Sequence, residues 1–230
     1  SDVYNWGYDP VNYNVPEGCY SSDPDDGAVR IRELKEAVRA LHQNGFRVIM
    51  DVVYNHTYHL DSWLWRTEPW YFYRQNPDGT PGDGSACGND LATERSMCAR
   101  YIRESVLYWA REYHMDGFRF DLMGLLDTDL MQSIRAALDE EYGAGEKLVF
   151  GEPWAARRSP MRAGSHPAGK RALPLLDKRG RVQDVVFAGG LDIDTHKKAC
   201  APVVIMAGGL GTRLYPYTKI LPKPLIPIGE

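Results

Sequence analysis

Three short runs of apolar and β-branched residues, each ending in polar groups, stand out in the hydrophobic pattern of this chain. They span residues 47–56, 117–122 and 147–154. Residues 47–53 are almost continuously apolar, as expected for a strand buried on both faces beneath helices. Each run is therefore predicted to form a strand whose carboxyl end carries polar side chains.

Segments with helical periodicity accompany these predicted strands. Residues 28–44 form an amphipathic pattern, and Gly45 follows as a natural helix stop. Two further helices are predicted between the strands. The apolar positions that set the three helical patterns are Ile31, Leu34, Val38, Leu41, Ile102, Val106, Trp109, Tyr113, Leu130, Ile134 and Leu138. The chain therefore alternates strand, helix, strand, helix, strand.

This alternation predicts an α/β fold with a parallel sheet, of the kind that places its chemistry at the carboxyl ends of the strands. A closed (β/α)8 TIM barrel typically needs about 250 residues. Here the repeating pattern occupies at most residues 1–171 of a 230-residue chain and contains three recognisable strands. We therefore expect a partial barrel.

Composition narrows the class of protein. The chain is 43% hydrophobic, carries a net charge of −4 and contains no apolar run long enough for a membrane span, so we expect a soluble, globular protein without a membrane partner. Its four cysteines, at positions 19, 87, 98 and 200, lack the spacing of a metal site or a disulfide framework. Reduced thiols slightly favour a cytoplasmic location, which otherwise stays open because the chain begins without an initiator Met.

Carboxylates are the candidate catalytic groups at the ends of the predicted strands. In the second strand the period of two places Arg119 and Asp121 on one face, where the guanidinium would keep the carboxylate ionised, as a nucleophile requires. Glu152 ends the third strand, and we expect Pro153 and Trp154 to desolvate it, as suits a general acid. Such a pair about 5 to 5.5 Å apart cleaves glycosidic bonds with retention of configuration.

Four segments in this order resemble the α-amylase superfamily, specifically type I pullulanases. They are residues 4–10 (YNWGYDP), 51–56 (DVVYNH), 117–124 (GFRFDLMG) and 151–154 (GEPW), and residues 87–90 (CGND) resemble the loop after the third barrel strand. The resemblance covers about residues 2–170. It implies that the recognised strands are numbers three to five of the barrel.

The resemblance also implies roles for individual residues. Asp121 would be the nucleophile and Glu152 the acid/base, acting on α-1,6 branch bonds of pullulan, glycogen or limit dextrin. The residues implied in substrate binding are Tyr8, His56, Arg119, Asn89 and Trp154. The family also uses a third carboxylate on a later strand, and no segment after Glu152 resembles it. We therefore expect this chain alone to be poorly stable and inactive.

The last part of the chain carries a second, unrelated pattern. Residues 202–213 (PVVIMAGGLGTR), followed by 222–225 (PKPL), predict a buried strand that runs into a glycine-rich, phosphate-binding turn. This pattern resembles the truncated, Rossmann-like start of sugar-1-phosphate nucleotidyltransferases. The implied nucleotide-binding residues are Gly208, Gly209, Gly211, Thr212, Arg213 and Lys223. Mg²⁺ would be needed only if that domain were complete.

The predicted domains are a partial pullulanase-type barrel (1–171), a CBS-like hairpin and linker (172–200) and a nucleotidyltransferase start (201–230). Hydrolysis would need no cofactor, although Ca²⁺ is possible, and no metal ligands are predicted. The expected partner is an α-glucan. A basic stretch between residues 157 and 181 is interrupted by Pro and Gly, which favours a solvated linker over a nucleic-acid site. Oligomeric state stays open.

Several alternatives remain at this stage. Arg119 and Asp121 would also suit a purely structural ion pair, and His56 a buried loop histidine. The aromatic residues at positions 63–73 suit either core packing or stacking on a sugar. As a whole, the chain is a hydrolase fragment, a noncatalytic glucan-binding remnant or, through its tail, a sugar-1-phosphate nucleotidyltransferase. Whether the join between the two patterns is natural is not decided.

Overall fold

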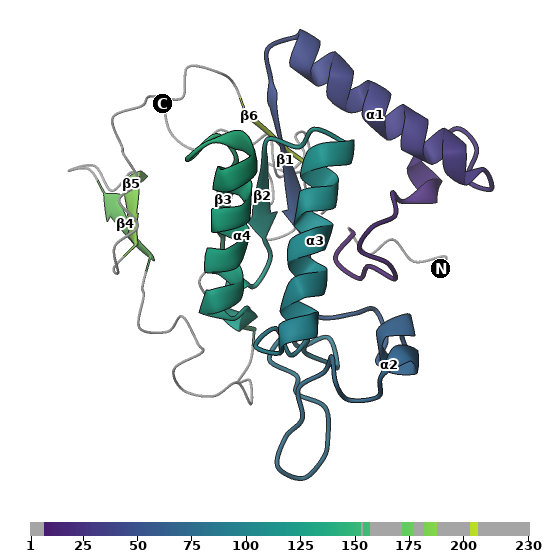
Figure 1. Cartoon of the computed structure of the whole chain (residues 1–230), viewed down its shortest axis with the longest axis vertical. Coiled ribbons are helices and arrows are strands. Elements are labelled where there is room, and N and C mark those ends of the chain that lie inside the picture. The colour runs from purple at the N-terminus through teal and green to yellow at the C-terminus, as the bar shows by residue number, and fades with distance from the viewer. Residues whose placement is uncertain (1–6, 153, 157–171, 177–181, 188–202, 207–230) are drawn as a thin grey trace, which may run out of the picture.

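Helices and parallel strands alternate along most of the chain (Figure 1). The computed structural model describes residues 7–152, 154–156, 172–176, 182–187 and 203–206. In chain order its elements are η1 (Gly18–Tyr20), α1 (Gly27–Gln43), β1 (Arg47–Val52), α2 (Trp63–Thr67), α3 (Ser96–Glu112), β2 (Gly117–Phe120), η2 (Met123–Leu125), α4 (Thr128–Tyr142), β3 (Leu148–Gly151), β4 (Ala172–Leu176), β5 (Val182–Phe187) and β6 (Val203–Met206).

The main sheet is parallel and four-stranded, in the order β3-β2-β1-β6. Its register places Asp51 of β1 opposite Arg119 of β2, and Phe120 of β2 opposite Gly151 of β3. All three predicted strands therefore lie side by side and point the same way. This confirms the parallel α/β arrangement, whereas the partial TIM barrel and the Rossmann-like tail stay predictions.

The helix predicted at residues 28–44 is confirmed as α1 within one residue at each end, and the two further predicted helices are confirmed as α3 and α4. Asp26 caps α1 by accepting a hydrogen bond from the Ala28 N–H at 2.8 Å. The helices α3 and α4 pack together beside the strands, as Figure 1 shows. Apolar side chains of both helices, including the fully buried Ile102 and Leu138, share one core with Val48 and Phe118 of the sheet. This is the periodicity that the sequence pattern predicted.

The second strand is shorter than expected. It ends at Phe120, because Leu122 adopts a left-handed conformation with φ 43° and caps the 3-10 turn η2. The two-residue alternation predicted for residues 117–122 therefore does not extend to Leu122. A non-glycine residue in this region of backbone space is strained, and such strain tends to occur where a functional site requires a particular turn.

A glycine brings the ends of β2 and β3 close together. A Cβ atom on Gly151 would lie 2.4 Å from the Phe120 carbonyl oxygen and 2.9 Å from the Met123 Cβ. No side chain fits that gap, so only glycine permits this approach. The next residue in the chain, Glu152, is thereby held beside the end of β2, where its N–H donates to the Phe120 carbonyl at 3.2 Å.

The long excursion between β1 and α3 packs much of its aromatic content into the core. Tyr73 is fully buried, and Trp65, Trp70 and Phe72 pack against the core cluster. Trp65 and Trp70 meet edge to face with ring centroids 4.5 Å apart. Trp63, by contrast, is 41% exposed. Core packing therefore accounts for most of this aromatic group, whereas the exposed Trp63 stays available for stacking on a ligand.

Two features come from the last third of the chain. The strands β4 and β5 pair antiparallel, the pairing that the predicted hairpin requires, although its expected turn lies outside the described residues. The strand β6, from the segment predicted to start another domain, pairs in parallel with the outer edge of β1.

Among the described residues, no helix is long and apolar enough to cross a membrane.

Candidate functional site

The carboxyl ends of β1, β2 and β3 bring three carboxylates together. Asp51 lies near the end of β1, Asp121 directly follows β2, and Glu152 directly follows β3. The Asp121 N–H donates to the Val52 carbonyl at 2.9 Å, which fixes the backbone of Asp121 against the end of β1. The parallel topology thus places the predicted nucleophile and acid/base together at the carboxyl ends of the strands.

Arg119 links all three carboxylates. Its Nη1 atom lies 2.7 Å from Asp51 Oδ1 and 3.0 Å from Asp121 Oδ1, and its Nη2 atom lies 2.5 Å from Glu152 Oε1. The guanidinium is only 14% exposed. One positive charge therefore holds three negative groups, which leaves the cluster with a local excess of negative charge.

Asp51 is the most buried member of this cluster, with 4% of its side chain exposed. Desolvation raises its pKa, against the opposing effect of Arg119. Burial alone would lower the pKa of Arg119, but Asp51 and then Glu152 overcome that effect and raise it. Asp51 also accepts a hydrogen bond from the Tyr8 hydroxyl at 2.8 Å. Burial and this carboxylate raise the pKa of Tyr8.

Glu152 is held differently from the expectation based on the sequence. Its Oε1 atom pairs with Arg119, and its Oε2 atom accepts the Leu122 N–H at 3.3 Å. Trp154, which was expected to desolvate it, is 55% exposed, and Pro153 lies outside the described residues.

His56 and Asn89 lie in the buried loop beyond β1. His56 is 2% exposed, and its Nδ1 and Nε2 atoms lie 2.6 Å from Asn55 Oδ1 and 3.3 Å from Asp9 Oδ1. The amide of Asn89, which is 1% exposed, makes hydrogen bonds to both the N–H and the carbonyl of Thr57. Asn89 therefore fixes the loop that carries His56, and its direct contact with a sugar stays a prediction.

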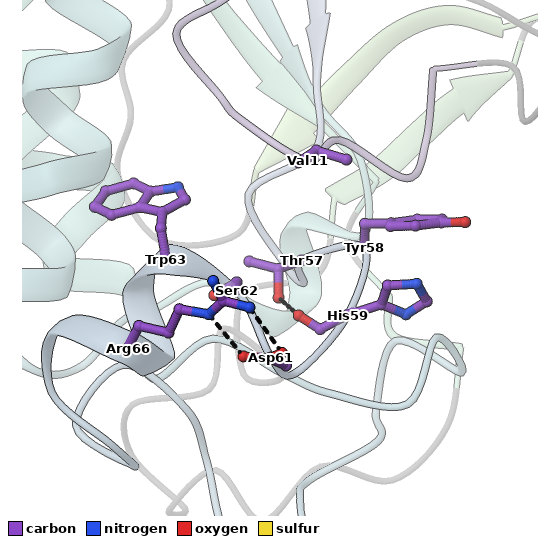
Figure 2. A pocket seen from close by; sticks show the side chains of 8 residues that line it. All are labelled: Val11, Thr57, Tyr58, His59, Asp61, Ser62, Trp63 and Arg66. Carbon is purple, nitrogen blue, oxygen red and sulfur yellow. Dashed lines mark hydrogen bonds and ion pairs between the residues drawn. The ribbon is translucent and has the colours of Figure 1, made fainter. Parts of the chain in front are cut away.

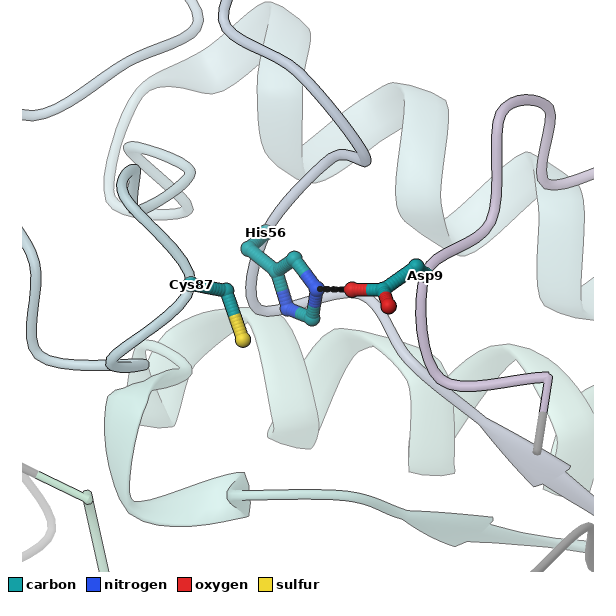
Figure 3. A group of neighbouring side chains, drawn as sticks. All are labelled: Asp9, His56 and Cys87. Carbon is teal, nitrogen blue, oxygen red and sulfur yellow. Dashed lines mark hydrogen bonds and ion pairs between the residues drawn. The ribbon is translucent and has the colours of Figure 1, made fainter. Parts of the chain in front are cut away.

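Cys87 approaches the same loop. A ligating atom of each of Asp9, His56 and Cys87 lies within 4.8 Å of the other two (Figure 3). Burial raises the pKa of the Cys87 thiol to about 11, helped by the charges of Asp9, Asp121 and Asp83. The sequence did not predict this group, because its members come from three separate segments without metal-ligand spacing.

A pocket of about 250 Å³ opens beside this loop (Figure 2). Its lining consists of Val11, Thr57, Tyr58, His59, Asp61, Ser62, Trp63 and Arg66. Arg66 and Asp61 form a two-pronged ion pair on its wall, with both N···O distances at 3.0 Å. Neither Asp121 nor Glu152 lines this pocket. The implied nucleotide-binding residues, from Gly208 to Lys223, lie outside the described part of the chain.

The arrangement predicts that Arg119 contributes strongly to stability. An Arg119→Gln substitution would leave Asp51 buried without its cation, and we expect a loss of about 3 kcal/mol of unfolding free energy. Urea denaturation measures this loss. The matched control is Arg111→Gln, which breaks the exposed pair with Glu141 and should cost at most about 1 kcal/mol. Equal losses in the two variants would contradict the prediction.

Comparisons with known proteins show which proteins this chain is similar to. The chain is 46% identical over 155 residues to a pullulanase of Bacillus subtilis (strain 168), a match that covers 66% of this chain and 21% of the relative. It is 36% identical over 200 residues to a pullulanase of Klebsiella aerogenes, covering 83% and 18%. The second match is longer than the predicted segment 1–171, so it extends beyond that boundary.

Solved structures of pullulanases also match this chain. The apo pullulanase of Paenibacillus barengoltzii matches with a TM-score of 0.68 at 49% identity, over 71% of this chain and 25% of that one. For the type I pullulanase of Bacillus subtilis str. 168, the TM-score is 0.67 at 42% identity, over 72% and 23%. A family model described as nucleotidyl transferase matches residues 202–230. The chain spans about a fifth of the length of the curated relatives that it matches, and within that span it is homologous to pullulanases.

Proposed function

We propose that this chain carries the nucleophile and the acid/base of a retaining α-glucan debranching hydrolase. The observation that supports it most is the contact of one guanidinium with both Asp121 and Glu152 at the carboxyl ends of neighbouring strands. Two carboxylates at such an edge are the groups that retaining glycoside hydrolysis needs. The proposed bond is the α-1,6 branch of pullulan, glycogen or limit dextrin.

The reaction would proceed in two steps. Asp121 attacks the anomeric carbon while Glu152 gives its proton to the glycosidic oxygen, so that the C–O bond breaks and an ester to Asp121 forms. Glu152 then removes a proton from water, which hydrolyses the ester and restores both groups. Arg119 stabilises the Asp121 carboxylate before attack and after release, because it lies 3.0 Å from that side chain.

The substrate would be an α-glucan whose sugar rings meet the loops around β1. Relatives support this class: pullulanases of Paenibacillus barengoltzii and Bacillus subtilis were crystallised with maltohexaose and alpha-cyclodextrin and with maltose, respectively. In this chain the proposed sugar contacts are Tyr8, His56, Arg119, Asn89 and Trp154. Trp154 is the most exposed of the described aromatic rings beside this edge and therefore suits stacking on a sugar. No cofactor takes part in these steps.

A segment exchange tests the proposed roles. Residues 7–156 would replace the matching segment of the Bacillus subtilis pullulanase, and we expect the hybrid to release reducing ends from pullulan. Asp121→Ala and Glu152→Ala should each lower kcat by a factor of about 10² or more, since each removes a group that takes part in bond cleavage. Azide should partly restore turnover in both variants when the substrate carries an aryl leaving group, which departs without a proton from Glu152.

The azide products separate the two roles. The glycosyl azide should have inverted configuration for Asp121→Ala and retained configuration for Glu152→Ala. The control is Asp61→Ala, which alters a carboxylate on the wall of the pocket in Figure 2, away from the proposed chemistry. Full activity in Asp121→Ala would contradict the proposal.

The isolated 230-residue chain is proposed to be inactive, because no segment after Glu152 resembles the third carboxylate segment of the family. Pullulan hydrolysis by the purified chain would overturn this part of the proposal. The main alternative is a noncatalytic glucan-binding remnant. It would retain affinity for a branched dextrin without turnover, and that affinity would fall in a Tyr8→Ala variant.

The tail supports a separate proposal, namely that residues 201–230 are a nucleotidyltransferase-type segment joined to the pullulanase-type segment. The family match to residues 202–230 supports this origin. Residues 172–200 would form the CBS-like hairpin and linker between them. A long sequencing read across the codons of residues 172–176 distinguishes one continuous gene from two that were wrongly joined.

We expect no working nucleotide site in this tail. Millimolar nucleoside triphosphate with Mg²⁺ should leave the thermal midpoint of the 230-residue chain unchanged, because the family match in this chain is confined to residues 202–230. Differential scanning fluorimetry with and without the nucleotide makes the measurement. A rise in the midpoint that disappears in Arg213→Ala and persists in Arg103→Ala would show that the tail binds nucleotide after all.

A further inference from the structure

Three potential metal ligands converge in Figure 3. Asp9 comes from the segment before η1, His56 from the loop after β1, and Cys87 from the long excursion before α3. His56 is buried, Asp9 is partly exposed and Cys87 is exposed. The group therefore consists of one buried ligand, His56, and two ligands that are partly or fully exposed to solvent.

The tautomer of His56 is set by its neighbour. The Asn55 Nδ2 group donates to the Asp121 carbonyl at 2.9 Å and to Asp121 Oδ2 at 3.1 Å. This orients the amide so that Asn55 Oδ1 faces His56 Nδ1, 2.6 Å away. An amide oxygen only accepts, so Nδ1 must carry a proton. Nε2 hydrogen-bonds to the Asp9 carboxylate at 3.3 Å, so a cation would bind Nε2 by displacing its proton. A partner on the other ring nitrogen is usual for a histidine that binds metal.

The distances fit a tetrahedral cation. Ligands at the bond lengths that Zn²⁺ prefers lie about 3.3 to 3.6 Å apart at the corners of a tetrahedron. His56 Nε2 and Asp9 Oδ1 are already 3.3 Å apart. The Cys87 sulfur, within 4.8 Å of both ligand atoms, needs a movement of about 1 Å at its exposed position. Its thiol now donates to the Ser85 carbonyl at 3.6 Å, a long contact that is readily given up.

The surrounding charge favours a cation. Asp9, Asp83 and Asp121 all act electrostatically on the Cys87 sulfur. A divalent cation relieves the repulsion between these carboxylates and a thiolate, and it deprotonates the thiol that it binds. Nitrogen, sulfur and oxygen ligands together suit Zn²⁺ better than Ca²⁺ or Mg²⁺, which prefer oxygen alone.

We propose that Asp9, His56 and Cys87 form a binding site for a divalent cation of the zinc class, with one coordination position left to water. The ion would bind His56 Nε2, the atom that faces away from Asn55, and would therefore compete with the sugar contact proposed for His56. Because Asn55 also contacts Asp121, the site adjoins the proposed nucleophile. Cation binding to these three ligands does not depend on glucan hydrolysis, so it can be tested without an assay of activity.

Cobalt replaces zinc as the spectroscopic probe. Titration of the full chain with Co²⁺ under reducing conditions should give one bound ion, with the intense visible bands of tetrahedral cobalt and a sulfur-to-cobalt charge-transfer band in the near ultraviolet. Zn²⁺ should displace it and remove both. Cys87→Ser should abolish the charge-transfer band and weaken Co²⁺ binding by a factor of about ten or more. Asp9→Asn should keep that band but weaken binding similarly.

Cys19→Ser is the matched control, because Cys19 is also an exposed free cysteine but lies outside the group. It should bind cobalt as the unaltered chain does. Circular dichroism of each variant checks that it remains folded. Three results would overturn the proposal: no tetrahedral cobalt spectrum in the unaltered chain, a charge-transfer band that persists in Cys87→Ser, or one that disappears in Cys19→Ser.

Discussion

The carboxyl end of this sheet depends on a single guanidinium that contacts three carboxylates at the ends of neighbouring strands. Arg119 reaches Asp51, Asp121 and Glu152 at 2.7, 3.0 and 2.5 Å. Asp51 is almost completely buried, and a buried carboxylate without a cation is strongly unfavourable. The parallel register, which sets Asp51 opposite Arg119, is therefore tied to the electrostatics of the site. The same pairing therefore fixes the positions of the residues at the strand ends.

Local patterns were sufficient to predict the three long helices and the strands β1, β2 and β3. The helical periodicity of Ile102, Val106 and Trp109 predicted α3, because these side chains form one buried face. The apolar run of β1 indicated a strand covered on both faces, and its parallel partners placed Asp121 and Glu152 at one edge. The turn at Leu122 was missed, because no glycine marks its left-handed backbone.

Contacts between distant segments could not be predicted in the same way. Asp51 was recognised as part of a motif but not as the partner of Arg119, because strand register depends on packing across the whole sheet. The approach of Cys87 to His56 depends on the path of a long loop, which carries no periodic signal. The pairing of β6 with β1 was also unforeseen: hydrogen bonds along a strand edge can join segments with unrelated sequence signatures.

A double-mutant cycle between Asp51→Asn and Arg119→Gln tests the central electrostatic link most directly. The unfolding free energies of the unaltered chain, both single variants and the double variant give the coupling between the two side chains. If the buried pair holds the strand ends together, the coupling should be about 2 kcal/mol, and the double variant should be more stable than the sum of the single losses implies. Single losses that add to within about 0.5 kcal/mol would contradict this account.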